Sequence, residues 1–235
     1  MLIILLSTCS ALGPGNGCTG SSVALPAAEC AAWTGLFDAT GGTAWNICSV
    51  NRTDPCACGM NTGWNFCGPP FGQLDHLVYL QLDDVGARGT LPDSIGNLTK
   101  VTTFSMAFNE LSGTIPTSVG RLSSVQELAL EHNILSGTLP RELIALPNLQ
   151  YLDAELNQLS GTLPSTIAKM SKLKRLDLLG NAFSGLLPLL PWEQYTSGCW
   201  LEGISFDCPL PPGALTNCTG DGHHPPSCTA VNDTA

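Results

Sequence analysis

The sequence predicts a right-handed α/β solenoid with a parallel β-sheet on its concave face and a disulfide-bonded cap at each end. Two observations lead to this fold class. One pattern of leucine, asparagine, glycine and proline recurs every 24 residues, without insertion, from residue 77 to residue 196. The eleven cysteines all lie outside residues 68–198, in two groups near the chain ends. Stacked repeats expose an apolar coil face at each end, and the cysteine-rich segments are placed to cover those faces.

Within each repeat, apolar residues at positions 4 and 6 alternate with more polar ones, which is typical of a short strand with one buried face. The five repeats begin at Leu77, Val101, Val125, Leu149 and Leu173. Strands of successive repeats are expected to pair in parallel, about 4.8 Å apart. Position 9 is asparagine in four repeats, and its amide can satisfy backbone groups that a turn leaves unpaired. The predicted asparagine ladder is Asn109, Asn133, Asn157 and Asn181.

The six letters LSGTLP, at 135–140 and again at 159–164, recur as LSGTIP at 111–116. We interpret them as the corner turn that every coil of the solenoid repeats. The glycine allows a positive φ or a close backbone approach, and the proline suits a position that donates no ladder hydrogen bond. Apolar residues at positions 15, 19 and 22 are expected to close each coil from the convex side.

The pattern L-x-x-L-x-L-x-x-N-x-L followed by LSGTIP resembles the plant-type leucine-rich repeat, as in receptor-kinase ectodomains and polygalacturonase-inhibiting proteins. The resemblance covers 77–190. It implies protein, peptide or glycan ligands, bound on the concave or lateral face.

Residues 18–76 are predicted to form the N-terminal cap and 197–228 the C-terminal cap, followed by a disordered tail at 229–235. In the first cap, PAAECAAWTGLFDATGG reads as an amphipathic helix that begins near Pro26 and ends at Gly41 and Gly42. Cys199 and Cys208 are close enough in sequence to pair. We expect all cysteines of the mature chain to be paired, with no bridge between the two end groups. The predicted disulfide cysteines are Cys18, Cys30, Cys48, Cys56, Cys58, Cys67, Cys199, Cys208, Cys218 and Cys228.

The apolar start MLIILLSTCSALG is interpreted as a secretory signal peptide covering residues 1–12, with a truncated gene start or a lipid-anchored Cys9 as alternatives. Removing it would leave ten cysteines, an even number. Disulfides and sequons both favour a secreted, extracellular protein. No later stretch reaches the roughly 18 apolar residues that span a bilayer, so we expect no membrane span. The candidate N-glycosylation sites are Asn51, Asn97, Asn217 and Asn232.

The formal net charge of −10 argues against a nucleic-acid partner, because phosphates need a basic surface. The sequence has no nucleophile elbow, zinc-protease motif or phosphate-binding loop, so we predict a noncatalytic protein without cofactor or metal. The CAC stretch at 56–58 is interpreted as disulfide-forming and His223-His224 as part of a solvated tail.

Side chains at positions 2, 3, 5, 7 and 8 are expected to face the concave surface, where seven carboxylates outnumber the two cations Lys174 and Arg175. Tyr79, Phe108 and Tyr151 should project from the same open face. This face is the predicted ligand surface, for an extracellular protein or peptide that is basic, or for a glycan. A merely solvated acidic face and calcium binding by neighbouring carboxylates are the alternatives. The predicted ligand-binding residues are Tyr79, Asp83, Phe108, Glu127, Glu131, His132, Tyr151, Asp153 and Glu155.

The function that these observations predict is noncatalytic recognition outside the cell. A receptor or co-receptor ectodomain cut from a longer chain, or a structural protein of the cell wall or matrix, remain alternatives. The oligomeric state is left open.

Overall fold

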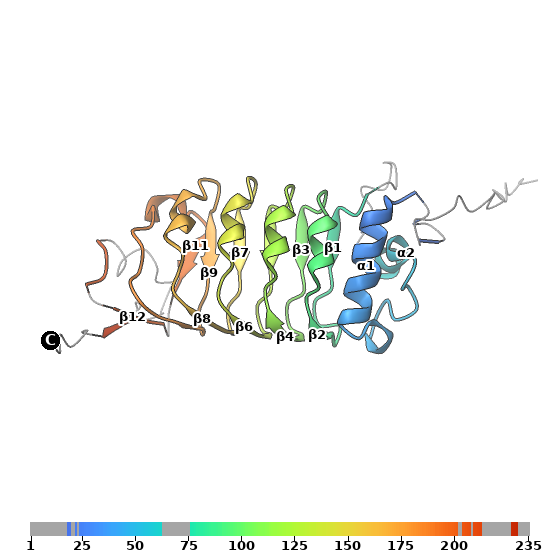
Figure 1. Cartoon of the computed structure of the whole chain (residues 1–235), viewed down its shortest axis with the longest axis horizontal. Helices are drawn as coiled ribbons and strands as arrows, with labels where there is room; N and C mark the ends of the chain where they lie inside the picture. Colours follow the sequence, from blue (N-terminus) through green and yellow to red (C-terminus); the bar gives the residue numbers. More distant parts are fainter. Residues whose placement is uncertain are drawn as a thin grey trace, which may run out of the picture.

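The computed structural model describes residues 18–19, 22, 24–62, 76–201, 204–207, 209–212 and 227–229, and its coils stack into an elongated solenoid (Figure 1). Helix α1 (Ala27–Ala39) packs at one end of the rod, and strands β12 (Ser205–Asp207) and β13 (Ser227–Thr229) lie at the other. The predicted signal peptide lies outside the described residues, as do Cys67, Cys208 and Cys218 and the sequons Asn217 and Asn232. No helix in the described ranges is both long and apolar enough to cross a bilayer.

The first sheet has six parallel strands in the order β1-β3-β5-β7-β9-β11. Five of them occupy positions 3 to 5 of the five repeats, and their central residues, such as Leu80, Leu128 and Leu152, are buried. The sixth strand comes from Gly198–Trp200, beyond the fifth repeat. The strands are β1 (Tyr79–Gln81), β3 (Thr103–Ser105), β5 (Glu127–Ala129), β7 (Tyr151–Asp153), β9 (Arg175–Asp177) and β11 (Gly198–Trp200).

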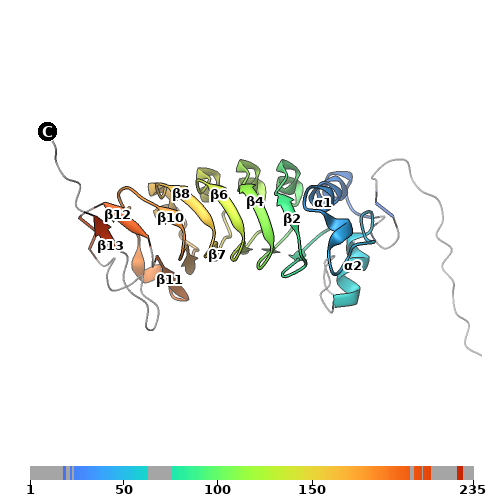
Figure 2. The same ribbon diagram turned by 90° about the horizontal axis from the view of Figure 1, so that it is seen from below.

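The sequence predicts that the LSGTLP segments are corner turns, and this prediction is wrong. The first three or four residues of each segment belong to a strand of a second parallel sheet. This sheet runs in the order β10-β8-β6-β4-β2 and is visible in Figure 2, where its strands lie side by side across the solenoid. Its strands are β2 (Arg88–Thr90), β4 (Glu110–Thr114), β6 (Ile134–Gly137), β8 (Gln158–Gly161) and β10 (Ala182–Phe183). The strands form because the backbone of each coil pairs with the next coil, as Ser112 does with Ile134. The predicted positive φ of the motif glycines is present, at 74° for Gly113 and 78° for Gly137.

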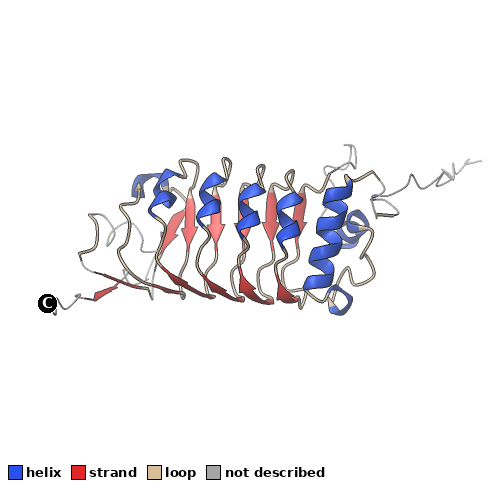
Figure 3. Ribbon diagram, viewed as in Figure 1, coloured by secondary structure: helices blue, strands red, loops and turns tan. Residues whose placement is uncertain are grey.

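The convex side carries one short 3-10 helix per coil, and Figure 3 shows these helices in a row over the strands. Each of η3 to η6 begins directly after an extended proline, because proline fixes φ and donates no hydrogen bond. The buried Ile115, Val119 and Leu122 close the second coil from this side. The helices are η3 (Asp93–Asn97), η4 (Thr117–Arg121), η5 (Arg141–Ala145), η6 (Ser165–Lys169) and η7 (Trp192–Gln194).

The N-terminal end is closed by α1 together with η2 (Gly42–Ala44) and α2 (Pro55–Thr62). Trp33, Phe37 and Trp45 pack their rings 5.1–6.2 Å apart beneath the first coil. Buried Glu29 accepts a hydrogen bond from the backbone N–H of Leu77 and contacts the ring of His76, so it ties α1 to the segment just before β1.

For four cysteines of the N-terminal cap the disulfide prediction is confirmed, by the bridges Cys18–Cys30 and Cys48–Cys58. Cys56 in the N-terminal cap and Cys199 in β11 each take part in a disulfide bond as well.

Candidate functional site: the concave sheet and its edge

The buried asparagines fix where the concave strands end. The side-chain amide of Asn133 donates to the carbonyls of Met106, Leu130 and Glu131, and its Oδ1 accepts the N–H of Leu111. The same arrangement recurs at Asn109, Asn157 and Asn181, each of which is at most 9% exposed. Each asparagine therefore ties the end of a first-sheet strand to the start of a second-sheet strand in the neighbouring coil.

A hollow of about 180 Å³ opens on the concave face, between β5, β7 and β9. The sequence predicts an open face here, so the hollow is a correction to that expectation. The strands run in register, with Glu127 opposite Tyr151 and Tyr151 opposite Arg175, so side chains of three coils converge. The lining residues are Glu127, Leu128, Ala129, Glu131, Tyr151, Asp153 and Arg175.

Arg175 is the cation of this hollow, but it is already engaged. Its Nη2 donates to Asp153 at 2.8 Å and to Asp177 at 3.2 Å, and its guanidinium lies 4.8 Å from the ring centre of Trp200. Asp177, which the sequence placed on the open face, is only 3% exposed. The cation predicted to oppose the concave carboxylates is thus held at the β9 end of the hollow, and it offsets two of them.

Glu131 was predicted to be exposed, but it is half-buried. Its Oε2 atom is inaccessible to water and has no hydrogen-bond partner among the described residues. Burial, together with the nearby charges of Asp153, Asp83 and Glu155, raises the pKa of Glu131 to about 7. Burial likewise raises the pKa of Asp177 to about 6. The hollow therefore holds carboxyls that are short of positive partners.

One oxygen from each of Asp153, Glu155 and Asp177 lies within 4.8 Å of the others. Carboxylate oxygens at such distances are the ligand type that calcium prefers. Two of these three carboxylates already bind Arg175, which supplies positive charge at the same place.

The edge between the two sheets bears a second feature, which we call the ridge: Phe108, His132 and Leu156, with Ile134 beside them. Phe108, Leu156 and Ile134 are 53%, 42% and 47% exposed. The rings of Phe108 and His132 are stacked, with centroids 4.3 Å apart. Phe108 was predicted to project from the open strand face, but it follows β3 and lies at the edge of the sheet. Ile134 was not predicted, because exposure of an apolar residue in an assumed turn has no sequence signal.

The remaining predicted binding residues play different parts. Tyr79 is exposed at the first strand. Asp83 accepts hydrogen bonds from Ser105 Oγ and from the N–H of Ala107, so it links adjacent coils. His132 Nε2 lies 3.4 Å from Glu155 Oε1. Of the two sequons within the described ranges, Asn97 is exposed and Asn51 is half-buried.

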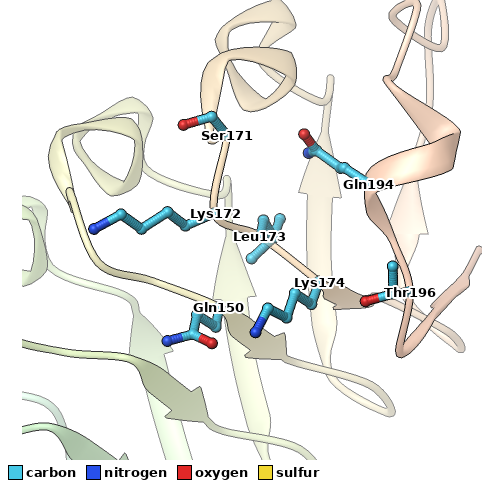
Figure 4. Close-up of a pocket in the computed structure, with 7 residues that line it drawn as sticks. All are labelled: Gln150, Ser171, Lys172, Leu173, Lys174, Gln194 and Thr196. Carbon is cyan, nitrogen blue, oxygen red and sulfur yellow. The ribbon is translucent and has the colours of Figure 1, made fainter.

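A larger pocket, of about 520 Å³, lies at the opposite edge of the first sheet (Figure 4). It is lined by Lys172 and Lys174 together with polar and aliphatic groups of the fourth and fifth repeats. Lys172 donates to Asn148 Oδ1 at 2.7 Å. Positive charge therefore gathers at one edge of the first sheet, while the hollow and the ridge lie toward the other.

Comparison with known proteins agrees with this architecture. The Leucine Rich Repeat family matches residues 148–170. No curated protein matches the chain. The structure resembles that of the Arabidopsis receptor kinase HAESA ectodomain in complex with an N-terminally extended IDA peptide hormone ligand. The TM-score is 0.55 and the identity 29%, over 57% of this chain and 23% of that one.

The plant peptide hormone receptor RGFR1 in complex with RGF2 is similar at a TM-score of 0.50 and 31% identity, over 61% of this chain and 23% of the receptor. A plant ice-binding protein matches 81% of this chain and 58% of its own, with a TM-score of 0.63 and 22% identity, which shows the shared fold. The chain spans less than a quarter of the length of the two receptors.

These repeats, the two sheets and the capped first coil define a leucine-rich repeat protein. Its repeats are of the plant type, and the chain is related to the ectodomains of plant receptor kinases.

Proposed function

We propose that this chain is a noncatalytic recognition module that binds an extracellular peptide or protein on its concave sheet. The observation that carries the proposal is the hollow between β5, β7 and β9, which is lined by the carboxyl groups of Glu127, Glu131 and Asp153 and by Arg175, already paired with Asp153. Tyr79 and Tyr151 offer aromatic contact area on the same face, and aromatic residues are enriched at interfaces.

Two further observations support this function. The related receptor ectodomains of HAESA and RGFR1 are described with peptide hormone ligands. The two disulfides of the N-terminal cap fit an oxidising, extracellular compartment. The chain would reach that compartment either as a secreted protein or as part of a receptor.

The test selects binders for the full chain from a displayed library of random peptides and measures their dissociation constants. The concave variant Glu127→Lys with Glu155→Lys should weaken binding at least about tenfold, because it reverses two charges beside the hollow. The convex variant Arg121→Glu with Lys169→Glu is the matched control, since both residues are exposed and belong to the convex helices η4 and η6. It should bind within about twofold of the parent.

Rising salt should also weaken the parent complex, because screening acts on exposed charges first. Equal loss in the concave and convex variants, or no loss in either, would show that the concave sheet is not the binding surface.

A further inference from the structure

The ridge residues occupy a backbone conformation that their side chains disfavour. Phe108, His132 and Leu156 stand at position 8 of their repeats with φ of 55°, 53° and 49°. This left-handed region suits glycine, asparagine, aspartate or histidine, and for bulky residues such as Phe108 and Leu156 it costs on the order of 1 kcal/mol each. Position 8 of the fifth repeat is Gly180, with φ of 68°, and it shows the residue type that the geometry favours.

The backbone strain at these positions is not offset by burial of the side chains. Phe108 and Leu156 remain about half exposed, and Ile134 beside them is 47% exposed. Phe108 stacks on His132. Leu156 packs against Gly180, because a Cβ added to Gly180 would lie 2.7 Å from Cδ2 of Leu156. Three successive coils thus hold an apolar strip in the solvent at a cost in folding free energy, and the fold itself gains little from it.

The ridge and the hollow are joined residue by residue. His132 follows Glu131 in the chain, and Leu156 follows Glu155. The backbone N–H of Phe108 donates to the carbonyl of Glu131 at 3.0 Å, and that of His132 donates to the carbonyl of Glu155 at 3.0 Å. An apolar strip therefore borders a carboxyl group, Glu131, whose Oε2 has no partner within the described part of the chain.

From this juxtaposition, and resting on the proposed function, we propose that the ridge and the hollow bind one extended segment of the partner, in which an arginine or lysine stands next to a large apolar residue. The apolar side chain lies on Phe108, His132 and Leu156, and the cation enters the hollow toward Glu131 and Glu127. Three coils at about 4.8 Å spacing give a ridge about 10 Å long, which three to four extended residues cover. Charge complementarity selects a basic segment over an acidic one.

The decisive variant replaces all three ridge residues: Phe108→Asn, His132→Asn and Leu156→Asn. Asparagine tolerates the left-handed region, so the variant should unfold at an equal or higher urea concentration than the parent. The same change should weaken the selected peptides at least about tenfold, because it removes their apolar contact. The control Leu189→Asn removes another exposed leucine, one without a positive φ, and should leave binding within about twofold.

The peptides supply the second arm of the experiment. Sequences recovered on the parent chain, but not on the ridge variant, should contain arginine or lysine beside an aliphatic or aromatic residue. Replacing that arginine by uncharged citrulline in the synthetic peptide should weaken its binding to the parent at least about tenfold. The Glu131→Gln variant should bind the arginine and the citrulline peptides more nearly alike.

The outcomes separate this inference from the proposed function. Loss in the concave variant with unchanged binding in the ridge variant would uphold concave recognition and overturn the ridge. Enriched peptides without basic residues, or no peptide that prefers the parent over the ridge variant, would overturn it too. A parent chain that sediments as a dimer, and becomes a monomer in the ridge variant, would assign the ridge to self-association and overturn the inference.

Discussion

The two sheets of this solenoid are built by the same repeat but differ in what their exposed positions contain. The second sheet has two columns that repeat in nearly every coil: serine at 112, 136, 160 and 184, and threonine at 90, 114, 138 and 162. The first sheet changes from coil to coil, with Gln81, Ser105, Ala129, Asp153 and Asp177 along one column. Uniform positions are those that the stacking of coils constrains, and variable ones are free to take part in binding.

The energetics of the two sheets differ accordingly. In the second sheet each strand is anchored by a buried asparagine and a positive-φ glycine, so substitutions there should act on stability. In the first sheet the variable side chains leave carboxyls of raised pKa and an apolar ridge beside them. Substitutions there should therefore act on binding, and some of them should stabilise the fold. This contrast orders the predictions below.

The largest effect is expected for Asn133→Ala. The change leaves the buried backbone N–H of Leu111 without its acceptor. It also removes one of the donors to the carbonyls of Met106, Leu130 and Glu131, and it should lower the free energy of unfolding by about 2–3 kcal/mol. Urea unfolding measures it, with Gln158→Ala, exposed in the second sheet, as the control within about 0.5 kcal/mol. Similar losses in both variants would mean that the asparagine ladder does not hold the coils together.

A smaller loss is expected for Gly137→Ala. The residue has φ of 78°, and an added Cβ would lie 2.8 Å from Cγ2 of Thr114 in the preceding coil. Strain and contact together should lower the free energy of unfolding by about 1–2 kcal/mol. Pairing it with Thr114→Ser, which removes the facing methyl group, should recover part of the loss. A double variant no more stable than Gly137→Ala alone would show that the backbone conformation, rather than the contact, sets the effect.

The repeat could be predicted from sequence because its key residues act locally and recur at fixed positions. The recurrence of leucine at positions 4 and 6 indicates a buried strand face, and the amide of asparagine at position 9 indicates a turn whose backbone groups it satisfies. The second sheet could not be predicted in this way, since its strands contain glycine, precede proline and have a single buried residue, such as Leu111. Their hydrogen bonds lie between coils, and nothing within one repeat reveals them.

The candidate site was only partly predictable, for a related reason. The acidic concave face follows from counting residues at strand positions, but the hollow and the burial of Glu131 depend on three coils in register. The left-handed conformation at Phe108 and Leu156 is imposed by the coil against the preference of these residues, so their identity predicts the opposite.

The smallest effect is a stabilisation, and it depends on pH. The pKa of Glu131 is raised to about 7 in the folded chain, above its ordinary value of 4.5, so the folded state retains a proton that the unfolded state releases. Stability should therefore fall as pH rises from about 4.5 to 7, and the full penalty is present above that window. Glu131→Gln cannot ionise, and it also relieves the repulsion from Asp83, Asp153 and Glu155. The variant should be more stable than the parent by about 1 kcal/mol at pH 8 and about equal to it at pH 4. Urea unfolding at the two pH values measures the difference, and exposed Glu127→Gln should show none. An advantage of the same size at both pH values would mean that it does not come from the charge of Glu131. No advantage at either pH would mean that the hollow is open to water.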